Sequence, residues 1–345
     1  MPKIELGKLR FLLALLVLFS HIRVDFFLKL GWDTGSIYNF DPGSVAVVNF
    51  FAISGFVMAG LWKNHYDSAT SKLSRLQNTK AFYKDRIFRL FPQFVFWSAL
   101  TIFAIMALGI HTMYWKEISI PVLVHNLTMI PLGYNMYLHP TTLFIPQAWT
   151  LGLELTFYAS IPFLLNRLDW TKIYTLGYMS MLFFIFPYLG LLNPFWYGYQ
   201  LLPGILFIFI LGISVIDDVP RRRVVYFRTC RSYTALLLVI MQFSDRLYSK
   251  QFNKEVLLGT LLATFFLSRI AATSTKLGSW LGNLSYGIFL NHILVAALLE
   301  EYFPQLSARI VGAIVTVVIS FVTAGISYRL VEKPAIKFRR QFRPL

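Results

Sequence analysis

The sequence predicts an all-α integral membrane protein with about ten transmembrane helices and both termini in the cytoplasm. Hydrophobic residues make up 57% of its 345 residues and charged residues only 14%, which is outside the range of soluble globular domains. The apolar residues gather into long segments, and the basic residues gather between them. Because the net charge of +16 arises from these separate clusters, we expect it to reflect membrane topology. We expect no nucleic-acid partner.

Ten apolar segments approach the roughly 20 residues that a transmembrane helix needs. The seventh is the least regular, because Arg228 and Arg231 lie near its start. The predicted helices cover residues 9–30, 45–62, 90–110, 147–165, 173–192, 199–216, 229–244, 255–270, 280–300 and 308–330. An even number of crossings places both termini on the same side of the membrane.

The distribution of Lys and Arg predicts which side that is. With ten crossings, 25 of the 32 Lys and Arg residues fall on the side of the termini and seven on the other. The seven are Arg23, Lys29, Lys116, Arg246, Lys250, Lys254 and Arg309. Because cytoplasmic segments carry the excess of Lys and Arg, both termini are predicted to be cytoplasmic.

The first apolar segment also resembles a secretory signal peptide, because Lys3, Lys8 and Arg10 precede a short apolar core. Residues 21–25 contain no small-residue cleavage site, however, and the apolar character resumes as far as Leu30. We therefore expect this segment to remain as a transmembrane helix.

The rest of the chain indicates one domain without metal or disulfide chemistry. The connection 111–146 has an apolar middle, 121–133, that is too short to span and suits a re-entrant or interfacial segment. Its three histidines, His111, His125 and His139, lack the carboxylate spacing of a metal site. The single cysteine, Cys230, cannot form an internal disulfide. With no repeat or linker, residues 1–345 are predicted to form a single transmembrane domain, with a helical core at about 9–330 and a basic cytoplasmic tail at 331–345.

Arg10 and His21 stand out in the first predicted helix. Eleven residues separate them, so on an α-helix their side chains point within about 20° of each other, about 16 Å apart along the axis. An ionisable side chain within so apolar a segment is by default a candidate functional residue. We therefore expect one face of this helix to carry both residues, with Arg10 near the cytoplasmic surface and His21 deeper.

Several further motifs follow in a fixed order. They are Phe-Phe-Ala-Ile-Ser-Gly-Phe at 50–56, Phe-Tyr-Lys-Asp-Arg-Ile-Phe-Arg-Leu-Phe-Pro at 82–92, Gln-Ala-Trp-Thr-Leu-Gly-Leu-Glu-Leu-Thr-Phe-Tyr at 147–158, Leu-Gly-Asn-Leu-Ser-Tyr-Gly at 281–287 with Asn291 and His292, and Val-Glu-Lys-Pro at 331–334. Together with Arg10 and His21, this ordered set resembles the membrane-bound acyltransferase 3 family, from Arg10 to Pro334.

The resemblance implies transfer of an acyl group, most often acetyl from acetyl-CoA, to a hydroxyl group. The acceptor implied is a bacterial surface carbohydrate such as O-antigen, exopolysaccharide or glycolipid, and the location a bacterial inner membrane. The start of the chain departs from the family, since residues 4–10 read Ile-Glu-Leu-Gly-Lys-Leu-Arg. Many relatives also append a soluble hydrolase-like domain, whereas this sequence reads to Leu345; either a partner supplies that step or the step is not needed.

Acyl transfer needs a base for the acceptor hydroxyl, a donor for the developing oxyanion, and cations for the phosphates of the acyl donor. His21 is the candidate base, because an imidazole exchanges its proton near physiological pH; the alternative is a hydrogen-bonded core histidine. Glu154 either orients His21 and stabilises the imidazolium, or pairs with a basic residue to hold helices together. Asp25, one helical turn beyond His21, is a rival orienter or an acceptor-binding residue.

Four basic residues are candidates for the phosphates of acetyl-CoA: Arg10, Lys84, Arg86 and Arg89. Arg86 and Arg89 share a helix face. The alternative for such a cluster is a purely topological or lipid-binding role. Arg10 and Arg89 are the stronger candidates, because they border predicted helices at positions that match the family pattern.

Candidates for binding the acceptor are Trp149, Tyr158, Ser285 and His292, with packing and interface anchoring as the alternative roles. Ser285 and His292 are two helical turns apart, about 10 Å, which is too far for a nucleophile and its base. Direct transfer is therefore favoured over an acyl-serine intermediate. We expect no metal, and membrane lipids as partners.

Two further functions remain open from the sequence. A transporter or exporter of a lipid-linked sugar would also contain polar residues within the membrane, although no pair of broken, inverted-repeat helices is evident. An acyltransferase for another acceptor, such as a macrolide or a peptide, is the second.

Overall fold

The computed structural model describes residues 3–29, 40–67, 71, 73–249, 252–271, 273–307 and 310–342, with the side chains of these residues except 23–29, 245, 246 and 340. Over this part of the chain the regular structure is helical, apart from one isolated bridge between Ile4 and Ile270. The predicted all-α membrane class is confirmed. Asp25 has its backbone in the first helix, and its side chain lies outside the described residues.

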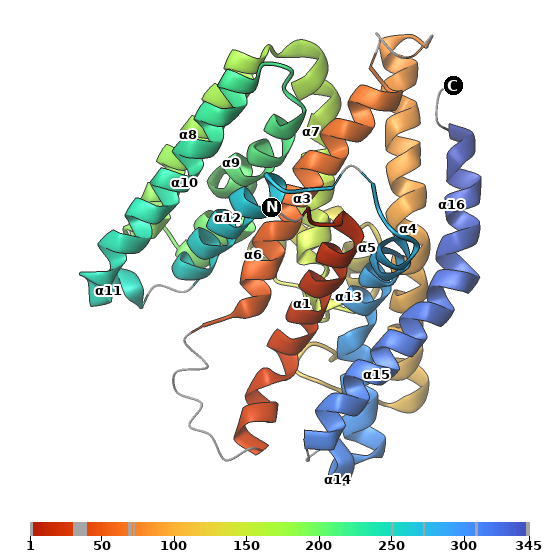
Figure 1. Ribbon diagram of the computed structural model, residues 1–345. Coiled ribbons are helices and arrows are strands. Elements are labelled where there is room, and N and C mark those ends of the chain that lie inside the picture. The colour runs from red at the N-terminus through yellow and green to blue at the C-terminus, as the bar shows by residue number, and fades with distance from the viewer. Residues whose placement is uncertain are drawn as a thin grey trace.

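Each of the ten predicted ranges contains a helix (Figure 1). The helices are α1 (Leu6–Lys29), α3 (Pro42–His65), α4 (Arg75–Leu108), α7 (Trp149–Arg167), α8 (Trp170–Tyr188), α9 (Leu202–Ile213), α10 (Pro220–Gln242), α12 (Asn253–Leu267), α13 (Lys276–Tyr302) and α15 (Ile310–Ser327). By length and composition, seven helices of the described residues can cross a membrane, those at α3, α4, α7, α9, α10, α13 and α15. The chain is therefore a multi-pass membrane protein, and ten crossings stay a prediction.

Two helices begin earlier than their apolar segments. α4 starts at Arg75 rather than near 90, and α10 at Pro220 rather than near 229. Their first turns are rich in Lys and Arg, which lower the hydropathy but are good helix formers. Ser74 also caps α4 in a capping box with Gln77. Beyond 330 the chain continues helically through Tyr328–Glu332, α16 (Lys333–Arg339) and Arg340–Phe342.

The start of α1 is fixed against the start of α13. A Cβ atom on Gly7 would lie 2.0 Å from the carbonyl oxygen of Gly278, so only glycine permits this close crossing. Just before α1, the Glu5 carboxylate accepts hydrogen bonds from the Thr275 backbone N–H (2.9 Å) and hydroxyl (2.7 Å). The bonds from Lys8 and Thr275 lower the pKa of Glu5 to about 2. This contact sets the depth at which α1 enters the bundle.

α3 occupies the middle of the bundle in Figure 1, with α8, α9, α10 and α12 on one side and α4, α13 and α15 on the other. It crosses α9 closely, because a Cβ on Gly212 would lie 2.0 Å from the Ala52 carbonyl oxygen. The end of α3, the start of α4 and α16 reach the top of the view, whereas α1 begins near mid-height. We call the top the basic end, because the Lys- and Arg-rich segments lie there; it is the end predicted to be cytoplasmic.

The connection 111–146 contains three short helical segments, α5 (Ile120–Leu127), η1 (Ile130–Tyr134) and α6 (Asn135–Leu138). Side-chain hydrogen bonds hold this connection together: Asn126 donates to the Thr142 carbonyl (3.0 Å) and Trp115 to the Leu143 carbonyl (2.9 Å). The segment η1 packs against α7. The connection is therefore an ordered part of the fold that packs against α7.

Candidate active site

α1 runs without a break past both Arg10 and His21, as predicted, and the two residues line different cavities. Arg10 lines the inner cavity, with an empty volume of about 820 Å³. His21 lines the outer cavity, with about 1220 Å³. The side chain of Arg10 is partly buried in the lining of the inner cavity.

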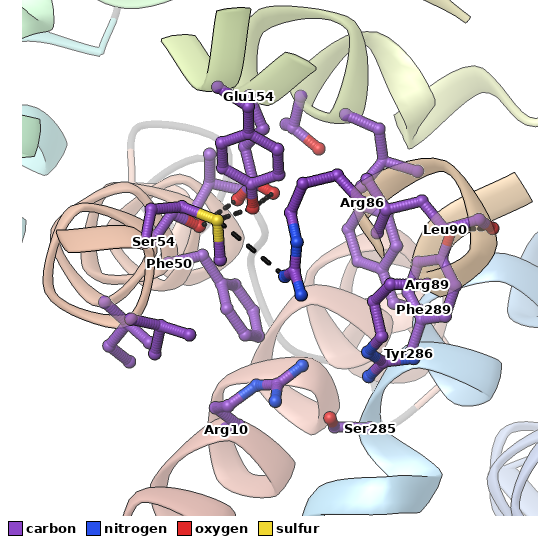
Figure 2. Close-up of a pocket in the computed structure, with 17 residues that line it drawn as sticks. Arg10, Phe50, Ser54, Arg86, Arg89, Leu90, Glu154, Ser285, Tyr286 and Phe289 are labelled. Atoms are coloured by element: carbon purple, nitrogen blue, oxygen red, sulfur yellow. Dashed lines mark hydrogen bonds between the residues drawn. The ribbon is translucent and has the colours of Figure 1, made fainter. Parts of the chain in front are cut away.

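The inner cavity contains three arginines, contributed by two helices (Figure 2). Arg86 pairs with Asp85, and Arg89 pairs with Glu332. Within the described residues Arg10 has no hydrogen bond or ion pair, which leaves its five N–H donors available to an anionic ligand. Arg89 uses one nitrogen for Glu332, so its remaining donors can also contact a phosphate.

Glu154 lies in the inner cavity rather than beside His21 (Figure 2). Its carboxylate accepts hydrogen bonds from the Ser54 hydroxyl (2.7 Å) and the Tyr158 hydroxyl (2.9 Å). These contacts join α3 to α7 and place the Glu154 carboxyl group in the cavity that the arginines line. No hydrogen bond connects Glu154 with His21 among the described residues, so no contact supports the hypothesis that Glu154 orients the histidine.

A second histidine takes the orienting position. His292 Nε2 lies 3.2 Å from His21 Nδ1, and the two ring centroids are 5.0 Å apart. His292 Nδ1 lies 2.9 Å from the Ile288 carbonyl and His21 Nδ1 lies 2.9 Å from the Val17 carbonyl. A carbonyl only accepts, so this pattern assigns the proton of each ring to Nδ1. His292 Nε2 is then an acceptor for His21, and His21 Nε2 is the basic nitrogen.

The outer cavity combines polar groups with aromatic rings. Asp41 accepts hydrogen bonds from Ser20 and from the Ser44 hydroxyl (2.5 Å), and its own backbone N–H donates to Glu255 (3.0 Å). The aromatic residues form a continuous series: the ring centroids of Trp149 and Tyr199 are 5.0 Å apart and those of Tyr199 and Phe252 are 4.8 Å apart. Polar side chains and aromatic faces together suit a ligand with hydroxyl groups and apolar C–H surfaces.

The two cavities share part of their lining. Val47, Thr150 and Phe289 belong to both, and these three side chains therefore form the wall between them. Gln147 fixes the position of this wall, because its side-chain amide donates to the carbonyls of Phe289 (2.6 Å) and Leu290 (3.2 Å). We call Val47, Thr150 and Phe289 the shared wall.

The other predicted site residues divide between the two cavities. Tyr158 and Ser285 line the inner cavity, and Trp149 lines the outer one. Lys84 lines neither: its side chain is exposed, and its ammonium lies 5.7 Å from the centre of the Phe342 ring. The structure therefore separates Lys84 from Arg86 and Arg89.

The three histidines of the connection 111–146 do not converge. His125 hydrogen-bonds to Asn135 (2.8 Å), His139 lines the outer cavity, and His111 is exposed. Within the described part of the chain, no cluster of three or more His, Cys, Asp or Glu residues is arranged to hold a metal ion.

Sequence reasoning assigned no role to several residues of these cavities. Asp41 precedes Pro42 at the start of α3, a typical helix N-cap signal, but nothing in the local sequence relates it to His21. Ser54 and Gln147 lie within the quoted motifs 50–56 and 147–158. The motifs therefore included these two residues, but only the packing of the helices shows which groups they contact.

Comparison with known proteins agrees with this architecture. A family model described as an acyltransferase domain matches residues 5–329. An uncharacterized protein of Aquifex aeolicus (strain VF5) is 28% identical over 211 residues, which cover 56% of this chain and 89% of that protein. No solved structure matches the chain.

Two longer relatives carry functional names. A Staphylococcus aureus (strain COL) protein provisionally named an O-acetyltransferase is 22% identical over 358 residues, covering 92% of this chain and 55% of that protein. The peptidoglycan O-acetyltransferase of Listeria monocytogenes is 23% identical over 353 residues, covering 91% and 53%. The chain thus spans about half the length of these two relatives. Because the family match covers nearly all the helices that build the two cavities, the chain belongs to the acyltransferase 3 family of membrane proteins.

Proposed function

We propose that this protein transfers an acetyl group from cytoplasmic acetyl-CoA to a hydroxyl of a carbohydrate or glycolipid at the opposite side of a bacterial plasma membrane. The whole chain, 1–345, would act as one transmembrane domain with both termini in the cytoplasm. The observation that carries the proposal is the placement of Arg10 and His21, on one helix, in two cavities that meet at a shared wall.

The inner cavity supports binding of the donor. Arg10 has no ion-pair partner within the described residues, and Arg89 retains unused donors, so both suit the phosphates of coenzyme A. Arg86 contributes positive charge beside them, although Asp85 occupies one of its nitrogens. The apolar walls beyond the arginines, which include Phe50, Ile53 and Val57, suit the uncharged pantetheine arm.

The outer cavity supports the chemical step. A hydroxyl oxygen of the acceptor attacks the thioester carbonyl carbon while His21 Nε2 takes the hydroxyl proton. The tetrahedral intermediate then collapses, the carbon–sulfur bond breaks, and His21 returns the proton to the leaving thiolate. His292 keeps the His21 ring in the required tautomer and stabilises the imidazolium. No residue needs to carry the acetyl group covalently.

The acceptor class rests on the outer cavity. Trp149 and Tyr199 offer ring faces to the C–H surfaces of a sugar, and Gln200 lines the same cavity with a side-chain amide that can bond to hydroxyl groups. The name of the Listeria monocytogenes relative, a peptidoglycan O-acetyltransferase, is consistent with O-acetylation of a glycan.

The deciding experiment uses purified protein reconstituted in nanodiscs with radiolabelled acetyl-CoA and glycans isolated from cells that lack the protein. We expect labelled glycan from the wild-type protein and none above background from His21→Ala. Labelled glycan in equal amounts from both proteins would exclude His21 as the base. An unlabelled glycan together with uptake of a lipid-linked sugar into vesicles would favour the transporter function instead.

A further inference from the structure

A third cavity lies between α10 and α12, away from the proposed reaction. Its empty volume is about 1430 Å³, and none of the described residues that line it also lines the inner or the outer cavity. Three arginines of α10, Arg223, Arg228 and Arg231, line it together with Arg269, which follows the end of α12. We call this cavity the arginine groove.

The lining of the arginine groove carries charge of one sign. Among the described residues, four arginines line it and no Asp or Glu does. The two acidic residues nearest in sequence are engaged elsewhere: Asp217 with Arg222 (2.8 Å) and Asp218 with Lys63 (2.6 Å). The groove therefore offers concentrated positive charge to an anion.

The arginines differ in how firmly they are held. Arg223 donates to the Val215 carbonyl (3.2 Å), and the guanidinium of Arg269 lies 3.7 Å from the centre of the Phe265 ring. Both therefore have positions fixed by the protein. Arg228 and Arg231 have exposed side chains, and they are the two that can reach out to a ligand.

The position of Arg231 makes an anionic ligand especially favourable. It follows Pro220, the first residue of α10, by eleven residues, which is about 16 Å along the helix. α10 is long and apolar enough to cross a membrane, and its next turns expose Leu236 and Val239. A guanidinium at that depth on a lipid-facing helix is costly unless an anion accompanies it.

Apolar side chains complete the groove. Phe227 on α10 faces Leu261 and Phe265 on α12 across the same cavity. Cations beside an apolar trough match an amphiphile with an anionic headgroup and hydrocarbon chains, and basic pockets between transmembrane helices on the cytoplasmic side are a known form of lipid site.

We propose that the arginine groove is a binding site for an anionic phospholipid of the membrane leaflet at the basic end. Arg228 and Arg231 hold the phosphate, and an acyl chain lies along Phe227, Leu261 and Phe265. The site does not depend on the proposed acetyl transfer, because its four arginines and the apolar side chains beside them line neither reaction cavity.

Native mass spectrometry of the purified protein, delipidated and titrated with dioleoyl phosphatidylglycerol or dioleoyl phosphatidylcholine, tests the site. We expect one phosphatidylglycerol to bind at least tenfold more tightly than phosphatidylcholine. Arg228→Gln/Arg231→Gln should weaken phosphatidylglycerol binding by roughly tenfold to thirtyfold, since each basic residue near an anionic headgroup strengthens binding severalfold and the variant removes two. Arg228→Lys/Arg231→Lys should retain most of the affinity, because it keeps both charges.

The matched control is Arg167→Gln/Arg221→Gln, which removes two exposed arginines from the basic end outside the groove. It should bind phosphatidylglycerol as the wild type does. Equal affinity of the wild-type protein for the two lipids would refute the proposal without any variant. Displacement of phosphatidylglycerol by 3′,5′-ADP would also overturn it, since the groove would then bind a nucleotide.

Discussion

The contact between His21 and His292 joins residues that lie 271 positions apart. A neutral histidine can carry its proton on either ring nitrogen. Here the carbonyls of Val17 and Ile288 accept from Nδ1 of His21 and His292, which fixes the proton of each ring on Nδ1. His292 thus acts on the proposed base without meeting the substrate. It is a positioning residue, and its effect should appear in the chemical step rather than in binding of the donor.

Replacing His21 by Ala should lower kcat/KM by about 10²- to 10⁴-fold, the usual contribution of a general base. His292→Phe should lower kcat by roughly tenfold to a hundredfold, because a misplaced base loses part of its effect, and should leave KM for acetyl-CoA unchanged. Steady-state kinetics across pH 5–9 separates the two, since His292→Phe should also displace the pH profile of kcat. A profile identical to that of the wild type would give His292 a structural role only.

Replacing Arg10 by Ala should raise KM for acetyl-CoA by about tenfold to a hundredfold, as expected for loss of a charge-assisted hydrogen bond. Lys84→Ala is the matched control, because Lys84 lies outside the inner cavity and should leave KM unchanged. Isothermal titration with a non-hydrolysable acetyl-CoA analogue measures binding directly. An Arg10 variant that binds normally and is slow only in turnover would contradict the phosphate role.

Glu154→Gln should impair activity while the folded protein remains in the membrane. The neutral amide has one acceptor oxygen where the carboxylate accepts from both Ser54 and Tyr158. Activity per mole of monodisperse protein, with the amount checked by size-exclusion chromatography, is the measurement. If only the yield of folded protein falls, Glu154 serves to hold α3 against α7.

At the scale of elements, the site depends on how α3, α7 and α13 meet at the shared wall of Val47, Thr150 and Phe289. The helical period predicted that Arg10 and His21 lie on one face, because that relation is internal to one helix. It did not predict the pairing of His21 with His292 or the separation of Glu154 from His21. Both depend on the crossing of different helices, which close contacts such as Gly7 with Gly278 determine.

Helix boundaries show the same distinction. The apolar segments predicted a helix at every one of the ten ranges, but hydropathy misplaced the starts of α4 and α10. Arg86 is buried in α4 because Asp85 accompanies it, and such a pairing is not visible as hydropathy. The capping box at Ser74 and Gln77 was the local signal for the true start of α4.

Changing the width of the shared wall should change which acyl groups are transferred. Val47→Ala should raise turnover of propionyl-CoA and butyryl-CoA relative to acetyl-CoA by about tenfold or more, the usual effect of one or two methylenes in an apolar site. Val45→Ala, on the same helix but lining neither cavity, is the control. Competition assays with mixed acyl donors report the ratio, and equal ratios for both variants would place acyl selection elsewhere.

At the scale of the whole molecule, the charge pattern predicts that both termini and the basic end face the cytoplasm. The proposed reaction requires this orientation, because its acyl donor is cytoplasmic and its acceptor lies on the opposite side of the membrane. Arg75 begins α4 at the basic end, and Lys116 follows the other end of this membrane-spanning helix by eight residues. Cys230 is buried, so single cysteines introduced elsewhere can be labelled over a low background.

A membrane-impermeant maleimide applied to intact spheroplasts should therefore label Lys116→Cys and leave Arg75→Cys unlabelled until the cells are lysed. Both side chains are exposed, so burial does not explain a difference between them. The reverse pattern would place the termini outside and the donor arginines on the wrong side of the membrane.

The shared wall has a consequence for the electrical properties of the membrane. A bacterial plasma membrane, the location proposed for this protein, sustains a voltage, and moving one elementary charge across 100 mV changes its energy by about 2.3 kcal/mol. Two water-accessible cavities that joined openly would discharge that voltage. Val47 and Phe289 are apolar and buried, and a narrow apolar constriction excludes water and ions. Under the proposed reaction, a neutral acetyl group can pass this insulating layer while the phosphates of its carrier remain on the side from which they came.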